Sequence, residues 1–152
     1  MGNLKLTSSA FEDGGEIPRE CGYKNGNREP QLTIGGTPEG TKSLALIMDD
    51  PDAMGAVGKV WVHWVAWNII SSHADMDDIF SNSRCNLGMT DFGEVGYGGP
   101  APPDKRHTYV FKLYALDDEL GLSNDDVTKA DVEKAMEGHI IEQTQLTGTY
   151  TP

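Results

Sequence analysis

Residues 60–70 have the sequence VWVHWVAWNII, the most β-prone stretch of the chain. Valine, isoleucine and tryptophan are enriched in strands because their branched or flat side chains pack well on a pleated surface. Successive strand residues point to opposite faces, which places His63 on the face of Trp61 and Val65 and the even-numbered residues on the other face. Both faces are largely apolar, so the pattern predicts a central strand that is covered on both sides.

Two further stretches predict long strands. Residues 43–48, SLALIM, form a continuous apolar run bounded by a glycine and a proline, which is typical of a strand buried on both faces. Residues 108–116, TYVFKLYAL, alternate in the manner of a strand, with the aromatic positions 109 and 111 on one face. Short strands are predicted over residues 4–7 and 146–150.

One segment has the pattern of a helix. Thr128 is placed to cap its N-terminus, and Asp131 occupies the acidic position of a capping box three residues later. Apolar residues then recur at helical spacing from Val132 to Ile140. Strand-like runs outnumber this segment and alternate little with helical ones. The chain is therefore predicted to be mostly β, a largely antiparallel sheet sandwich with a few peripheral helices.

Composition excludes several classes of protein. The 152 residues contain no linker or repeat, so they suit one domain over residues 1–152. The 24 acidic and 12 basic residues give a formal charge of −12, which disfavours nucleic acid because phosphate backbones attract clustered lysine and arginine. No apolar run is long enough to cross a bilayer and residues 1–6 do not form a secretory leader, so we expect a cytoplasmic location. Cys21 and Cys85 lack metal-binding spacing, and we expect free thiols.

Polar residues gather beside the predicted strands in three segments. DDPDA at 49–53 closes the first apolar run, VHW at 62–64 lies within the aromatic strand, and GGPAPP at 98–103 is followed by HTY at 107–109. Each segment brings an acid, an imidazole or a phenol beside a turn or an apolar strand. Together they predict one small polar pocket that could hold an anionic head group or carry out acid/base chemistry.

Each segment also has a purely structural explanation. The carboxylates at 49–52 could end the strand as an Asx turn. A lone His63 on an apolar strand is more often a core residue than a ligand, and burial would lower its pKa whereas a nearby aspartate would raise it. Residues 98–103 could form a plain turn or, through exposed N–H groups, an anion-binding concavity. His107 and Tyr109 are two residues apart at the start of a predicted strand, so their side chains project from the same face and can line one wall of the pocket.

Motifs for catalysis or metal binding are not found in the sequence. There is no Gly-x-Ser-x-Gly turn, no serine or cysteine that stands out as a nucleophile beside a base, and no His-Glu-x-x-His helix. We therefore assign no catalytic residue and no metal ligand. Acid/base chemistry by Asp50 and His63 stays open.

The chain resembles the phosphatidylethanolamine-binding protein family, in its prokaryotic Raf-kinase-inhibitor-like branch. The segments that carry the resemblance are SSAFEDGGEIP at 8–18, LIMDDPDA at 46–53, HWVAWNI at 63–69, YGGPAPP at 97–103, YVFKLYAL at 109–116 and GTY at 148–150. The resemblance implies a β-sandwich with a large antiparallel sheet, a smaller sheet and one or two peripheral helices. It also implies a small surface pocket for phosphate or a phosphorylated head group, no cofactor and no catalysis.

The resemblance further implies a set of ligand-binding residues around the pocket. The set comprises Asp50, Asp52, His63, Gly99, Pro100, His107 and Tyr109. Asp50 and His63 would line the pocket, and Asp52 would orient the loop or a histidine. Residues 99–100 would form the rim, His107 the floor, and Tyr109 would offer its phenol to the anion.

Two positions depart from the family pattern. Met54 stands where the family has the proline of Asp-Pro-Asp-Ala-Pro. A cis bond before a non-proline residue costs about 3 kcal/mol, so we expect a trans Ala53–Met54 bond. Thr108 stands where the family has the arginine of His-Arg-Tyr, which leaves Arg106 to compensate or an acid without its partner.

These observations favour a cytoplasmic, cofactor-free protein that binds a phosphate-like or zwitterionic small molecule and has a regulatory role. Protonated histidines and the Tyr109 hydroxyl would attract phosphate, and Asp50 would keep the histidines charged or bind an ammonium group. One alternative is an inhibitor of a protease or kinase that acts through its surface loops. Another is a hydrolase or isomerase that uses Asp50 and His63. Members of the branch are often described as dimers, which also allows a homodimer.

Overall fold

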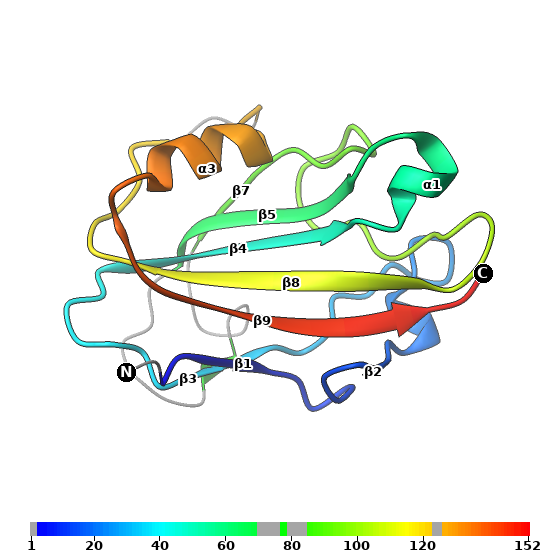
Figure 1. Cartoon of the computed structure of the whole chain (residues 1–152), viewed down its shortest axis with the longest axis horizontal. Helices are drawn as coiled ribbons and strands as arrows, with labels where there is room; N and C mark the ends of the chain where they lie inside the picture. Colours follow the sequence, from blue (N-terminus) through cyan, green and yellow to red (C-terminus); the bar gives the residue numbers. More distant parts are fainter. Residues whose placement is uncertain (1–2, 70–76, 79–84, 123–125) are drawn as a thin grey trace.

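The computed structural model describes residues 3–69, 77–78, 85–122 and 126–152, which form two β-sheets with short helices around them (Figure 1). Within these residues the large sheet has six strands in the order β2-β9-β8-β4-β5-β7, and the small sheet has the order β1-β3-β6. The strands are β1 (Lys5–Thr7), β2 (Gly15–Glu16), β3 (Thr33–Gly35), β4 (Ser43–Asp50), β5 (Trp61–Ile69), β6 (Asp77–Asp78), β7 (Asn86–Leu87), β8 (His107–Leu116) and β9 (Ile140–Tyr150). The helices are η1 (Arg19–Cys21, a 3-10 turn), α1 (Ala53–Val57) and α3 (Lys129–Met136). The predicted β-sandwich with peripheral helices is confirmed.

The large sheet is mixed rather than antiparallel throughout. Strands β9, β8, β4 and β5 pair antiparallel, but β2 runs parallel to the end of β9, with Gly15 opposite Gly148. Backbone hydrogen bonds from Gly14 N to Thr147 O (2.9 Å) and from Ile17 N to Thr149 O (2.8 Å) flank this pair. The long loop after β1 thus covers an edge of β9 that would otherwise be open.

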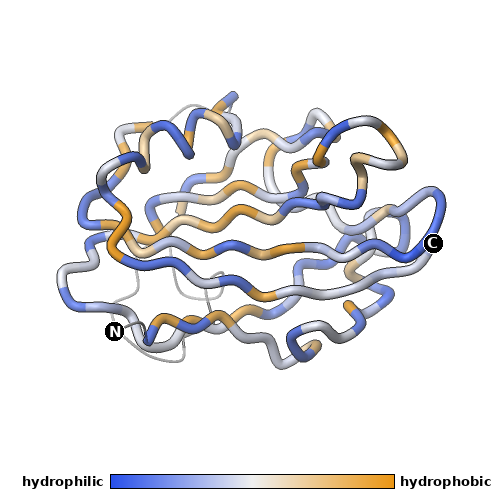
Figure 2. Tube along the Cα trace, viewed as in Figure 1, coloured by the Kyte–Doolittle hydropathy of each residue, from blue (hydrophilic) through white to orange (hydrophobic). Residues whose placement is uncertain are grey.

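β4 lies in the middle of the large sheet, and all eight of its residues are buried. Leu44, Leu46 and Met48 belong to the core between the two sheets. Ala45 and Ile47 belong to the core on the other face, which α3 covers. Figure 2 shows hydrophobic residues concentrated along β4 and β5. The prediction that residues 43–48 are buried on both faces is therefore confirmed.

β5 contains two irregularities that break the expected alternation. Met48 pairs with Trp64 whereas Asp49 pairs with Val62, so His63 is an extra residue in a β-bulge. As a result, the His63 ring contacts the ring of Tyr109 in the core between the sheets, with centroids 5.1 Å apart. The prediction that His63 shares a face with Val65 is wrong, because Val65 packs on the opposite face beneath α3.

The second irregularity follows near the end of β5. Leu44 pairs with Ile69 and Leu46 with Ala66, and Asn68 adopts a positive φ of 55°. The Asn68 side chain exchanges hydrogen bonds with the backbone of Leu120, which ties β5 to the segment after β8. Of the predicted strand 60–70, residue 60 precedes β5 and residue 70 lies outside the described residues.

The predicted helix begins as expected and ends early. Thr128 and Asp131 form the capping box at the start of α3. The helix ends at Met136, and Gly138 then adopts a φ of 80°, which turns the chain into β9. Ile140 therefore begins a strand and does not continue the helix as predicted, and β9 is longer than the predicted strand 146–150.

Cys21 and Cys85 are free thiols, as expected. Helices long and apolar enough to cross a membrane are not found in the described part of the chain.

Candidate functional site

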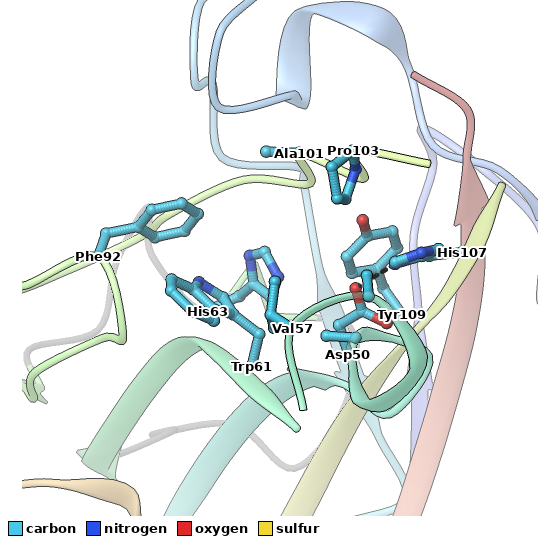
Figure 3. Close-up of a pocket in the computed structure, with 11 residues that line it drawn as sticks. Asp50, Val57, Trp61, His63, Phe92, Ala101, Pro103, His107 and Tyr109 are labelled. Atoms are coloured by element: carbon cyan, nitrogen blue, oxygen red, sulfur yellow. Dashed lines mark hydrogen bonds and ion pairs between the residues drawn. The ribbon is translucent and has the colours of Figure 1, made fainter. Parts of the chain in front are cut away.

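A cavity of about 150 Å³ opens at one end of the large sheet (Figure 3). β4 ends there, whereas its antiparallel neighbours β5 and β8 begin there. Figure 3 shows His63 and Phe92 on one side, His107 and Tyr109 on the other, and Ala101 and Pro103 across the top. The lining consists of Asp50, Ala53, Ala56, Val57, Trp61, His63, Phe92, Ala101, Pro103, His107 and Tyr109. The structure thus brings together the three predicted polar segments.

His107 is held between two carboxylates. Its Nδ1 lies 2.6 Å from Asp50 Oδ2, its Nε2 lies 2.7 Å from Asp104 Oδ1, and its side chain is 0% exposed. Burial acts to lower the pKa of His107, but the hydrogen bonds to Asp50 and Asp104 outweigh burial and raise it. An imidazole donates from both nitrogens only when it is protonated, so His107 is the cation of this site.

His63, in contrast to His107, is neutral because it is buried without a carboxylate partner. Its Nδ1 lies 2.7 Å from Gly98 O, and burial lowers its pKa despite that hydrogen bond and the nearby charge of Asp50. Because a carbonyl oxygen can only accept, the proton is assigned to Nδ1, and Nε2 is left as an acceptor. The expectation that Asp50 keeps both histidines charged is therefore wrong for His63.

Two hydrogen-bond donors in the lining are buried without a partner among the described residues. They are the hydroxyl Oη of Tyr109 and the indole Nε1 of Trp61. Burial, then the charge of Asp50 and, more weakly, a poorly aligned interaction of the hydroxyl with that carboxylate raise the pKa of Tyr109 far above its ordinary value, so the phenol keeps its proton. Buried donors are rarely left unpaired in proteins, and a cavity lined by two residues that carry them is suited to a ligand with acceptor atoms.

Asp52 does not line the cavity and instead fixes its entrance. Its backbone N–H donates to Asp50 Oδ1 (2.9 Å), and its Oδ2 accepts from the backbone N–H of Thr108 (2.8 Å). The exposed carboxylate of Asp52 therefore ties the loop after β4 to the start of β8, where the family's arginine would stand. The Ala53–Met54 bond is trans, as predicted, and Met54 points outward from α1 with 55% of its surface exposed.

Gly99 and Pro100 lie behind the cavity wall rather than on it. Gly99 N–H donates to Asn27 Oδ1 (2.7 Å), and Pro100 O accepts from Tyr23 N–H (2.9 Å). A Cβ on Gly99 would lie 2.0 Å from the backbone oxygen of Cys21, so only glycine fits there. Of the predicted residues, Asp50, His63, His107 and Tyr109 line the cavity, whereas Asp52, Gly99 and Pro100 support it.

Among the polar and aromatic residues at the site, three were missed from the sequence: Trp61, Phe92 and Asp104. Trp61 borders His63 in the aromatic strand, and Asp104 precedes His107 by three residues, so each had a signal in its spacing. Phe92 had none, because it lies in a loop without a strand or helix pattern. Its ring stacks on Tyr23 with centroids 3.9 Å apart and meets the edge of His63 at 5.4 Å. In the described ranges, no group of three or more His, Cys, Asp or Glu is arranged to hold a metal ion.

Comparison with known proteins identifies the family. The model of the family described as phosphatidylethanolamine-binding protein matches residues 7–151. The chain belongs to this family. Two relatives of this phosphatidylethanolamine-binding protein homologue, both named UPF0098 protein, come from Chlamydia muridarum and Methanothermobacter thermautotrophicus. Each is 40% identical over 152 residues, with 97% of this chain and 98% of the relative covered.

Solved structures of the family have the same fold. The phosphatidylethanolamine-binding protein homologue CT736 of Chlamydia trachomatis superposes with a TM-score of 0.85 at 36% identity, over 97% of this chain and 96% of that one. Escherichia coli YbcL, described as a new member of the mammalian family, also gives 0.85, at 30% identity and 98% coverage of both chains. None of the four relatives named here carries the name of an enzyme.

Proposed function

We propose that this chain binds, in the cytoplasm, a small molecule with a phosphate-like or zwitterionic head group and acts as a regulatory binding protein. The observation that carries the proposal is the pair of buried donors without a hydrogen bond of good geometry among the described residues, Tyr109 Oη and Trp61 Nε1, on two residues that line one cavity. Leaving such donors unpaired costs about 1–3 kcal/mol each, so a ligand that accepts from both gains that free energy on binding.

The charges of the site narrow the choice of head group. Asp50 is negative, and the positive charge of His107 is shared between Asp50 and Asp104. A fully ionised anion would therefore be repelled by Asp50, whereas a head group that keeps one proton would be repelled less and could donate a hydrogen bond to the carboxylate. A monoprotonated phosphoryl group can accept from Tyr109 and Trp61 and donate to Asp50 or to His63 Nε2. The ammonium group of a zwitterion would find the same carboxylate.

The size of the cavity favours a head group over a larger molecule. Sites for drug-sized ligands begin at about 300 Å³, and this cavity measures about 150 Å³. Its remaining lining is apolar, which strengthens the few polar contacts by excluding water. His63 Nε2 could act as a base, but the described lining supplies no serine, threonine or cysteine nucleophile. Binding without turnover is therefore the function that we propose.

Calorimetric titration with inorganic phosphate and with phosphoethanolamine tests the proposal. Tyr109→Phe removes one donor, and because a hydrogen bond to a charged group contributes about 1.5–3 kcal/mol, phosphate affinity should fall at least tenfold. His63→Ala should also weaken binding. Tyr114→Phe is the matched control, because Tyr114 lies on the same strand with its half-buried side chain packed against the core on the opposite face of the sheet.

The proposal requires that the control keeps wild-type affinity while both cavity variants lose affinity. If Tyr109→Phe and His63→Ala bind phosphate and phosphoethanolamine as tightly as the wild-type protein does, the proposal is refuted. Turnover of either compound would replace binding by catalysis as the function of the cavity.

A further inference from the structure

A second cavity, of about 280 Å³, lies on the other side of the wall formed by Ala101 and Pro103. We call it the proline groove. Its lining consists of Arg19, Lys24, Asn25, Pro100, Ala101, Pro102, Pro103, Tyr150 and Pro152. Because Ala101 and Pro103 also line the head-group cavity, a ligand that passes over these two residues would occupy both sites.

The proline groove carries two positive side chains and no negative one. Neither Arg19 nor Lys24 forms an ion pair with a carboxylate of the described residues, although the chain has 24 acidic residues and 12 basic ones. The buried ion pairs of this protein use other cations, such as Lys112 and Lys129 on Asp49. Two cations that line one cavity and make no ion pair with a described carboxylate make it a local site for an anion on a strongly acidic protein.

The groove is already organised in the absence of a ligand. The Arg19 guanidinium lies 4.5 Å from the ring centroid of Tyr150, and its Nη1 donates to Thr151 O (2.7 Å). The Tyr150 hydroxyl donates to Arg19 O (2.8 Å) and accepts from Asn25 Nδ2 (2.7 Å). Contacts that fix the lining in advance reduce the ordering cost of binding, and the prolines of the wall act in the same way.

We infer that the ligand of this protein is a bis-anionic small molecule. Its phosphate-like head group enters the head-group cavity, and a second anionic group lies between Arg19 and Lys24 in the proline groove. This inference rests on the proposed function and names the class of ligand. Neither cavity alone reaches the roughly 300 Å³ of a typical small-molecule site, whereas the two together do.

A series of phosphonocarboxylates tests the inference. The phosphonate is kept constant, the carboxylate is placed two to six methylenes away, and alkylphosphonates of equal length that end in a methyl group serve as partners. At one or more lengths the carboxylate should improve the dissociation constant roughly three- to tenfold, as expected for two exposed ion pairs. The gain should shrink as NaCl is raised, because exposed pairs are screened.

Variants then locate the effect. Arg19→Gln and Lys24→Gln should each reduce the advantage of the carboxylate and leave the affinity for the methyl-ended partner unchanged. Lys42→Gln removes the same charge from the segment before β4, and it should leave the advantage intact. Arg19→Gln removes the contact of Arg19 with the Tyr150 ring. Any resulting disturbance of the groove would change the affinity for the methyl-ended phosphonate as well, so this compound is the control.

The outcomes separate this inference from the function on which it rests. If the methyl-ended phosphonates bind and the carboxylate adds nothing at any length, the inference is overturned and the proposed function stands. If the carboxylate helps equally in Arg19→Gln, Lys24→Gln and the wild-type protein, the second group binds elsewhere and the inference is again overturned. If no phosphonate binds, both fall.

Discussion

Tyr109→Phe should strengthen the folded protein while it weakens ligand binding. The Tyr109 hydroxyl is buried and makes no hydrogen bond of good geometry among the described residues, although the Asp50 carboxylate lies close to it, so folding takes a donor out of water without fully replacing its hydrogen bond. Phenylalanine keeps the ring, which packs against His63 and His107, and removes that donor. The same hydroxyl is the donor that we assign to the ligand, so one atom sets stability and affinity against each other.

The size of the effect follows from the cost of an unpaired buried donor, which is about 1–3 kcal/mol. Allowing for relaxation of the site, we expect the free energy of unfolding of the ligand-free protein to rise by about 1 kcal/mol. For a chain of this length that corresponds to about 2–4 °C in Tm. Saturating phosphate should raise the Tm of the wild-type protein more than that of Tyr109→Phe, because stabilisation by a ligand depends on its affinity.

Tyr97→Phe is the matched comparison. The Tyr97 hydroxyl also lies in the interior, but it donates to Cys21 O at 2.7 Å. Its removal leaves that carbonyl without this hydrogen bond and should lower the free energy of unfolding by about 1 kcal/mol. Urea unfolding monitored by tryptophan fluorescence, with and without phosphate, measures both variants. If Tyr109→Phe destabilises the ligand-free protein as much as Tyr97→Phe does, the hydroxyl of Tyr109 has a partner and the reasoning is wrong.

Two further predictions concern the frame of the site. Gly99→Ala should lower the free energy of unfolding by about 2 kcal/mol or more, because its Cβ would lie 2.0 Å from Cys21 O. Gly55→Ala, which has open space in α1, should leave stability unchanged or slightly raised, and equal urea midpoints for the two variants would contradict this account. The raised pKa of His107 predicts stability that is fully present below its unfolded value of about 6.5 and lost as pH rises through the folded value. Asp104→Asn should shift that loss to lower pH, and an NMR titration of His107 that does not move would count against the ion pair.

Much of the fold could be predicted because apolar runs mark the strands. Residues 43–48 and 108–116 are apolar or alternate cleanly, and both became central strands of the large sheet. β9 was recognised over its last five residues alone, because its first half, IIEQTQ, is half-exposed and mostly polar. The parallel pairing of β2 could not be predicted, because two residues of edge strand leave no pattern in the sequence.

The site was predicted in part for a similar reason. Polar residues at the ends of neighbouring antiparallel strands meet at the same end of a sheet. Asp50, His63, His107 and Tyr109 do so. Charge states are decided by contacts that a sequence does not contain. Asp104 gives His107 its second carboxylate, whereas burial keeps His63 neutral and the carbonyl of Gly98 places its proton on Nδ1.

The bulge at His63 accounts for both the failed prediction and the cavity. In an unbroken strand His63 would lie with Val65 beneath α3, far from Tyr109 and from the loop at residues 98–103. One extra residue turns the imidazole toward Tyr109, while Trp64 and Val65 still reach the cores on opposite faces. Bulges commonly redirect a side chain beside a binding site. The position where regular strand pairing fails is thus the one that brings the imidazole of His63 against the ring of Tyr109 at the cavity. Departures from regular local structure are expected at functional sites.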